Sequence, residues 1–230
     1  MGRRSVAIID PGPDVDDHVR ALASAVEDAD EVRILLTHGH ADHAGSAGRL
    51  AGELDAVVHG PEGIEGVTRV LLDGDRVDTD DGALVAVHTP GHTREHLAFH
   101  WPERDAVFVG DLLLGRGDTT WVAEYPGCVA DYLRSLERVG TLDARVLYPT
   151  HGPALDDPEE ALRRFAAHRR DRIEEVREAR SANPDADVDA LVDLVYGDTV
   201  PRAMRGAARK SLEAALHHLD EHLDEAEPPD

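Results

Sequence analysis

Histidine and aspartate crowd one short stretch, residues 37–43, which reads Thr-His-Gly-His-Ala-Asp-His. Imidazole and carboxylate groups are the usual ligands of zinc and of other first-row metal ions. Side chains two residues apart in an extended segment point the same way, so His38 and His40 can bind one ion. Asp42 and His43 follow just around the turn and can face a second ion. Ligands packed this closely favour a metal site over a role in packing.

Three further candidate ligands occur later in the chain, each in a similar setting. His92 lies in Thr-Pro-Gly-His-Thr, Asp111 ends Val-Phe-Val-Gly-Asp, and His151 lies in Tyr-Pro-Thr-His-Gly. Each follows an apolar run typical of a strand, and each has glycine or proline beside it. That combination is typical of loops at the ends of strands. The sequence therefore predicts partners for the ligands of residues 37–43.

The elements that must position these residues can be predicted from apolar periodicity. Strands are expected over short apolar runs, at 6–10, 32–36, 56–59, 67–72, 84–87, 97–101, 106–109 and 145–148. Helices are expected where apolar residues recur at helical spacing, at 16–29, 44–54 and 127–140. Strands followed by a helix occur twice, which fits an α/β fold, an αββα sandwich of two similar halves. The candidate ligands would then meet at the edge where loops from both halves come together.

The composition changes after His151, and a second, helical domain is expected. The predicted boundary divides the chain into residues 1–155 and 156–230. Charged helical stretches are expected at 158–180, 189–196 and 202–223, and the chain ends in an acidic tail at 219–230.

Acidic residues dominate the charge of the whole chain. There are 47 Asp and Glu against 24 Lys and Arg, only one of them lysine, and the formal net charge is −23 over 230 residues. Such self-repulsion destabilises a compact domain unless salt screens it, so adaptation to concentrated salt is the simplest interpretation. The charge also argues against simple electrostatic capture of nucleic acid.

Further features of the sequence concern disulfides, membrane spans and the cellular compartment of the protein. The single cysteine, Cys128, excludes an intramolecular disulfide. No run of about 18 apolar residues is present, so no transmembrane helix is expected. The N-terminal apolar stretch has only four residues, too short for a signal peptide. With no transmembrane helix expected either, the sequence predicts a cytoplasmic protein.

Taken together, these motifs resemble those of the metallo-β-lactamase-fold hydrolases. The resemblance implies two divalent ions, most simply zinc, although iron and manganese are chemically reasonable. It implies that the first ion is held by His38, His40 and His92. It implies that the second is held by Asp42, His43 and His151, with Asp111 bridging the two. Asp10, in Ile-Ile-Asp-Pro-Gly, matches the family's first motif and is expected to support the site from behind the ligands, as is His96.

A closer likeness lies within that superfamily. Residues 111–120 and 150–153 resemble the β-lactamase-like hydrolases that carry a C-terminal winged-helix-like domain, a group that includes a mitochondrial endoribonuclease. His168 and Arg169 share this likeness and are expected to face the pocket and contact substrate. The family normally has about two more strands ahead of the Asp10 strand. The first sheet is therefore expected to be trimmed, or the true start lies upstream.

The expected chemistry is hydrolysis by a metal-bound hydroxide, because metal binding lowers the pKa of water to about 7. Asp42 is expected to bind one ion and to orient that hydroxide. The bond cut would be an ester, a thioester or a phosphodiester, and the expected substrate is a small molecule. Two alternatives are a single-strand endoribonuclease and a hydroxyacylglutathione-type (glyoxalase II-like) thioesterase, which residues 89–96 also resemble. A metal-stabilised interaction protein is a more distant alternative, and the sequence leaves a homodimer open.

Overall fold

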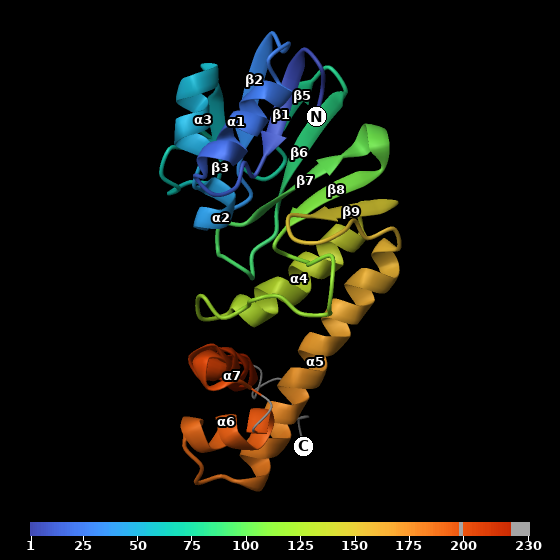
Figure 1. Cartoon of the computed structure of the whole chain (residues 1–230). Helices are drawn as coiled ribbons and strands as arrows, with labels where there is room; N and C mark the ends of the chain where they lie inside the picture. Colours follow the sequence, from blue (N-terminus) through green and yellow to red (C-terminus); the bar gives the residue numbers. More distant parts are fainter. Residues whose placement is uncertain (198–199, 222–230) are drawn as a thin grey trace.

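The computed structural model describes residues 1–197 and 200–221 as two β-sheets with helices on their outer faces, followed by a group of helices (Figure 1). This arrangement confirms the predicted αββα sandwich. Residues 222–230, which include most of the predicted acidic tail and the expected end of the last helix, lie outside the described residues.

The first sheet contains four parallel strands in the order β1-β2-β3-β4. Their bounds are β1 Ser5–Ile9, β2 Glu31–Leu35, β3 Val57–Gly60 and β4 Arg69–Val70. The helices that connect the first three strands are α1 Asp16–Ala25, α2 Ala41–Ala44 and α3 Ala47–Leu54. Val19 of α1 and Leu50 of α3 pack against Ile34 of β2 and Val58 of β3. This apolar layer fixes the strand ends from which the first candidate ligands project.

One predicted helix differs in the structure. The single helix expected at 44–54 is two helices, because α2 begins at Ala41 and ends before α3 begins at Ala47. The prediction was wrong at the start because Asp42 and His43 are polar and break the apolar periodicity that marks a helix. The early start places both residues in the only turn of α2, directly after His40.

The second sheet contains five strands in the order β5-β6-β7-β8-β9. Their bounds are β5 Arg76–Thr79, β6 Gly82–His88, β7 Leu97–Trp101, β8 Ala106–Gly110 and β9 Val146–Pro149. Neighbours are antiparallel except β8 and β9, which are parallel. The strands β6, β8 and β9 therefore run in one direction. Their carboxyl ends meet at a single edge of the sheet.

Strand β5 was missing from the sequence prediction. Only Val77 is apolar among its four residues, and Val77 is 3% exposed. Its pairing with β6 through the turn at Gly82 makes it a strand, which a search for apolar runs does not detect.

The inner faces of the two sheets form one apolar layer. Leu35 of the first sheet meets Leu84, Leu97 and Phe99 of the second, and all four are nearly inaccessible to solvent. The outer face of the second sheet is covered by α4, Cys128–Gly140, and by the first half of α5, Pro158–Ala182. The two sheets are thus held in one body with their ligand-bearing edges together (Figure 1).

The C-terminal part is helical over its described residues. Helix α5 is followed by α6 Val188–Tyr196, the short 3-10 helix η3 Arg202–Met204 and α7 Arg205–Glu221. Residues 156–197 and 200–221 contain no strand, so the β-hairpin wing of a winged-helix domain is not seen within them.

Helix α5 belongs to two apolar clusters. Phe165, near its start, packs with α4 on the sandwich, whereas Val176 packs with Leu191 of α6 and Leu212 of α7. The predicted domain boundary between residues 155 and 156 therefore remains a proposal. In packing terms, α5 runs continuously from the sandwich into the helical group (Figure 1).

Candidate metal centre

The first candidate ligands lie in the connection between β2 and α2. The chain leaves the sheet after Leu35, and His38 is fully buried while His40 is partly exposed. His38 Nε2 lies 3.0 Å from His40 Nδ1, and His92 Nε2 lies 3.0 Å from the same atom. His92 comes from the loop between β6 and β7. Three ring nitrogens from two sheets therefore converge on one point.

The second group gathers Asp42, His43 and His151. His151 Nε2 lies 3.2 Å from Asp42 Oδ2, and His43 Nε2 lies 3.8 Å from the same oxygen. Asp42 and His43 belong to α2, whereas His151 follows β9. The ligand atoms of these three residues lie within 4.8 Å of one another, as do those of the first group.

Asp111, directly after β8, lies between the two groups. Its Oδ2 is 3.7 Å from Nε2 of His92 in the first group. Its Oδ1 is 3.5 Å from Nε2 of His43 and 3.6 Å from Nε2 of His151 in the second. The two oxygens of this carboxylate thus face nitrogens of both groups, and Asp111 also lies close to His38 and His43 together, with ligand atoms within 4.8 Å of one another.

The donor atoms themselves test whether metal ions fit. His43 Nε2 and Asp111 Oδ1 are buried side-chain atoms without a hydrogen-bond partner, which is costly unless something binds them. Two imidazole nitrogens bound to one tetrahedral zinc ion would lie about 3.3 Å apart, given zinc–nitrogen distances of about 2.0–2.1 Å. The separations of 3.0 Å in the first group are close to that value. The residues present therefore fit divalent metal ions.

The ring orientations are set by groups behind the ligands. His43 Nδ1 donates to Asp10 Oδ2 at 2.8 Å, and His92 Nδ1 donates to the Trp121 carbonyl at 2.8 Å. Thr37 Oγ1 donates to Asp10 and lies 3.0 Å from His38 Nδ1, so its oxygen can accept the proton of that ring. In each case Nδ1 faces an acceptor and Nε2 is directed at the centre, so Nε2 is the atom that can bind a metal once the ring is neutral.

Asp10 is itself held tightly. Its side chain is 1% exposed, its Oδ1 accepts the Thr37 backbone N–H, and its Oδ2 also accepts from Thr150 at 3.1 Å. Asp10 thereby links the β2 loop to the segment that carries His151. The structure places Asp10 in contact with the side away from the centre of one candidate ligand, His43.

His96 also lies behind the ligands. Its Nε2 accepts the backbone N–H of Asp111 at 3.2 Å, and its Nδ1 faces Thr89 Oγ1 at 2.9 Å. Burial, together with the neighbouring His92, lowers the pKa of His96 to about 3. His96 is therefore a neutral ring that fixes the start of the Asp111 loop.

The electrostatics of the centre divide the histidines into two kinds. Burial opposes protonation of His43, but its hydrogen bond to Asp10 and the negative charges of Asp10 and Asp111 outweigh it and raise its pKa to about 10. Burial and neighbouring imidazoles lower the pKa of His38 far below its usual value, and burial also lowers that of His92. The pKa of the Asp111 carboxyl stays low because His43 more than offsets the effect of burial. Metal binding therefore requires His43 to lose a proton, whereas the neutral rings of His38 and His92 and the Asp111 carboxylate are already in the form that binds metal.

The centre is most exposed at Asp42 and His151. His38 and His43 are fully buried and His92 is 3% exposed, whereas the Asp42 and His151 side chains are 56% and 46% exposed. Substrate and solvent can therefore reach the centre from the side of Asp42 and His151.

The two residues expected to contact substrate lie on α5. His168 is partly exposed, and its Nδ1 lies 3.6 Å from Asp118 in the loop after Asp111. Arg169 is 5% exposed and donates to the Thr120 carbonyl of that loop at 3.0 Å. Both residues therefore contact the loop that carries Asp111.

Several residues of the site were missed by the sequence analysis. Thr37, Thr150 and the Trp121 carbonyl orient ligands, and Thr120 Oγ1 donates to the Asp111 carbonyl at 2.9 Å. Thr37 and Thr150 each stand next to a candidate histidine, which is a usable signal. The Trp121 carbonyl carries none, because every residue has a backbone oxygen.

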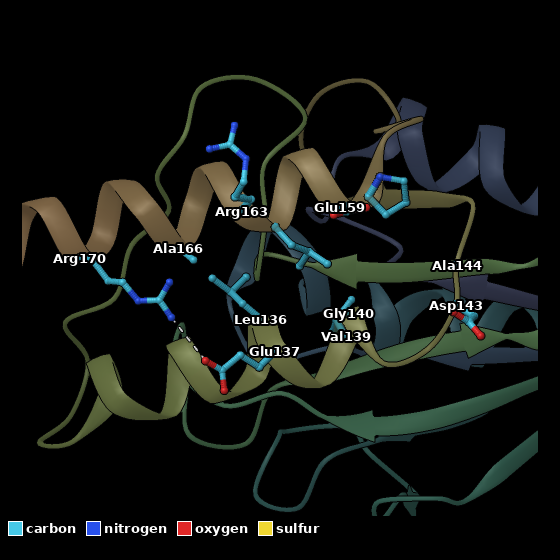
Figure 2. A pocket seen from close by; sticks show the side chains of 12 residues that line it. Leu136, Glu137, Val139, Gly140, Asp143, Ala144, Glu159, Arg163, Ala166 and Arg170 are labelled. Carbon is cyan, nitrogen blue, oxygen red and sulfur yellow. Dashed lines mark hydrogen bonds and ion pairs between the residues drawn. The ribbon is translucent and has the colours of Figure 1, made fainter.

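A cavity of about 470 Å³ lies elsewhere, between α4 and α5 (Figure 2). Glu137 and Arg170 form an ion pair of 3.4 Å across it. None of the predicted ligands lines this cavity, so it is separate from the metal centre. Its lining residues are Leu136, Glu137, Val139, Gly140, Asp143, Ala144, Pro158, Glu159, Leu162, Arg163, Ala166 and Arg170.

An αββα sandwich with histidine and aspartate groups at the shared edge of its sheets defines a class of metal-binding hydrolases. The family profile of the Metallo-beta-lactamase superfamily matches residues 2–151. The chain belongs to this superfamily, as its motifs predicted, and it is a hydrolase. No helix among the described residues combines the length and apolar character needed to cross a membrane.

Curated relatives extend the likeness beyond the sandwich. The chain is 30% identical to "Beta-lactamase-like protein 2 homolog" of Caenorhabditis elegans over 92% of its own length and 74% of that protein's. It is 31% identical to "Atrochrysone carboxyl ACP thioesterase" of Aspergillus chevalieri over 95% of its length and 71% of the relative's. It spans only 56% of another relative, a lactamase-like protein of Emericella nidulans.

A solved structure agrees in fold. A metallo-β-lactamase family protein from Thermus thermophilus superposes with a TM-score of 0.77 at 24% identity, covering 96% of this chain and 87% of that one. The coverage shows that the C-terminal helices are part of the shared architecture.

Proposed function

We propose that the chain is a dinuclear metal-dependent hydrolase that acts on a small thioester or ester. One observation carries the proposal: the two Asp111 oxygens face two separate groups of donors, at 3.7 Å on one side and 3.5 Å on the other. A carboxylate placed in this way suits two ions better than one. The relative named as a thioesterase supports the choice of bond.

Divalent ions, when bound, supply activation of water near neutral pH and polarise the oxygen of the bond under attack. The chain's own residues supply position and access. His38, His43 and His92 form the buried floor, and their rings are fixed by Thr37, Asp10 and the Trp121 carbonyl. This preorganisation keeps the donors in place before substrate arrives.

Asp42 is the residue placed to touch both water and substrate. Its carboxylate is 56% exposed, yet its Oδ2 is within 3.2 Å of His151 Nε2. A carboxylate on the open side can accept a hydrogen bond from the attacking water and so orient it. Asp42 and His151 then form the exposed part of the site, and a substrate carbonyl would approach there.

The test is a metal analysis followed by a turnover panel. Protein reconstituted with zinc, manganese or iron is assayed in about 2–3 M KCl, the range in which charge screening is nearly complete. The panel contains S-lactoylglutathione, a simple acyl thioester, a simple ester, a phosphodiester and a fluorogenic single-stranded RNA. We expect two bound ions per chain and turnover of a thioester or ester.

Asp42→Ala is the diagnostic variant and is expected to abolish turnover. Its matched control is Asp14→Ala, because Asp14 is a comparably exposed aspartate, 51%, that pairs with Arg49 instead of a candidate ligand. Full activity of a metal-free Asp42→Ala protein would overturn the proposal. RNA cleavage with silent thioesters would replace it with the endoribonuclease alternative.

A further inference from the structure

Arg169 is the only buried arginine among the described residues. It lies on α5, and its guanidinium stands 5.5 Å from the ring centre of Tyr132 on α4. Its Nη2 donates to the Thr120 carbonyl at 3.0 Å. Arg169 thus joins the long C-terminal helix to the loop that follows Asp111.

The contact with the Tyr132 ring offsets only part of the cost of burying this cation. Arg169 Nε has no hydrogen-bond partner among the described residues, and the one hydrogen bond found there goes to a neutral carbonyl. Removing a charge from water is unfavourable unless it is paired, so an apolar side chain would fill this space more favourably. Burial accordingly lowers the pKa of Arg169. A buried arginine at this position points to a role that depends on its hydrogen bond to the Thr120 carbonyl.

The contacts of the next residues indicate that task. Thr120 is 8% exposed, and its Oγ1 donates to the Asp111 carbonyl at 2.9 Å. The following residue, Trp121, accepts the Nδ1 proton of His92 on its carbonyl at 2.8 Å. Arg169 therefore holds a peptide segment, Thr120 and Trp121, that contacts both Asp111 and His92, a candidate ligand of the first group.

We propose that Arg169 is a positioning residue for the metal centre, acting through Thr120 and Trp121 on Asp111 and His92. Its burial and its bond to backbone favour this role over direct contact with substrate. The inference rests on the proposed metal-dependent function. It also gives the C-terminal helices a part in building the centre, because α5 carries Arg169 into the sandwich.

The experiment compares zinc affinity in three full-length proteins, measured by competition with a chromophoric chelator. Arg169→Met is expected to weaken binding of at least one ion by about 10- to 100-fold, the usual loss when an outer partner of a ligand is removed. Arg172→Met is the matched control, since Arg172 lies on the same helix, stands 4.6 Å from the Tyr196 ring and pairs with Glu175 instead of the 111–121 loop. It is expected to bind zinc as the wild type does.

Cobalt spectra of the same proteins separate positioning from packing. Displacement of Asp111 or His92 changes the coordination of cobalt and hence its visible absorption, whereas a loss of helix packing only lowers the melting temperature of the metal-free protein. A lower melting temperature with unchanged affinity and spectrum in Arg169→Met would overturn the proposal.

Thr120→Val tests the same path without disturbing α5. It removes the Oγ1 bond to Asp111 but leaves the carbonyl that Arg169 contacts. We expect weaker zinc binding in Thr120→Val, and a double variant less impaired than the two single losses predict. Strict additivity would overturn the proposed path, and Thr120→Val decides the matter if Arg169→Met does not fold. Absence of zinc binding by the wild type would overturn both proposals, whereas weakened binding in Arg169→Met supports this one even if no thioester is hydrolysed.

Discussion

Gly115 lies directly against Gly152, so that the loop after Asp111 and the turn after His151 touch through their backbones. A Cβ added at Gly115 would come within 2.1 Å of the Pro153 carbonyl oxygen, and the Gly115 N–H donates to the His151 carbonyl at 2.8 Å. The loops that carry Asp111 and His151 are therefore in direct backbone contact.

Gly115→Ala is expected to force these loops apart. Because the clash is with backbone atoms, we expect a loss of about 1–3 kcal/mol in stability, typical of overpacking. Metal affinity should fall as well, since His151 moves relative to Asp111. Denaturant unfolding and chelator competition measure the two effects. Gly52→Ala is the control, because its Cβ meets nothing within 4 Å and alanine favours the helix. Equal behaviour of the two variants would contradict the prediction.

Asp10→Asn should weaken metal binding while keeping the shape of the side chain. Asp10 Oδ2 receives three donors, from His43, Thr37 and Thr150, and an amide cannot accept from all of them. We expect about a 10- to 100-fold loss of zinc affinity, since His43 loses the group that orients its ring. Asp80→Asn is the control, because Asp80 accepts only from the backbone of Arg3 and Arg4. A wild-type affinity in Asp10→Asn would show that His43 is held by its packing.

The stability of the metal-free protein should fall in acid partly through His96. Its folded pKa of about 3 lies below the ordinary value of 6.5, so the unfolded chain binds the extra proton between these values. Stability from this group is full above pH 6.5 and is lost as the pH falls toward 3, at up to about 1.4 kcal/mol per pH unit. Urea unfolding of wild type and His96→Gln across this range gives the difference. Parallel curves would exclude the contribution of His96.

Salt should stabilise the fold over an unusually wide range. The net charge of −23 makes repulsion the dominant long-range term, and the screening length falls from about 10 Å at 0.1 M to about 3 Å at 1 M. Surface pairs such as Arg4 with Asp30 weaken under the same screening, but exposed pairs contribute little. Thermal melts in increasing KCl, compared with equal osmolality of sucrose, separate screening from water exclusion. A melting temperature independent of KCl would contradict adaptation to salt.

The fold was predictable wherever apolar residues are consecutive. The runs that became β1, β7 and β8 were found because their burial leaves an unbroken apolar signal. Strand β5 and the start of α2 were not predicted. Strand β5 depends on its pairing with β6 through a turn, and the first turn of α2 contains the polar candidate ligands Asp42 and His43.

The candidate ligands were predicted from motifs, and the structure brings all seven together. Of the groups behind them, Asp10 and His96 were expected from the sequence, whereas the other links were not. The Trp121 carbonyl and the buried Arg169 act through backbone atoms and tertiary packing, for which one sequence has no local pattern.

The donors of the centre come from both halves of the sandwich. His38, His40, Asp42 and His43 leave the first sheet, whereas His92, Asp111 and His151 leave the second. An ion bound by donors from both halves would cross-link the two sheets at this edge, because neither half alone completes either group. Release of the ion then requires the two sheets to separate locally at their ligand-bearing edge. The dissociation rate of the bound metal would therefore report how often the two halves of the sandwich open locally.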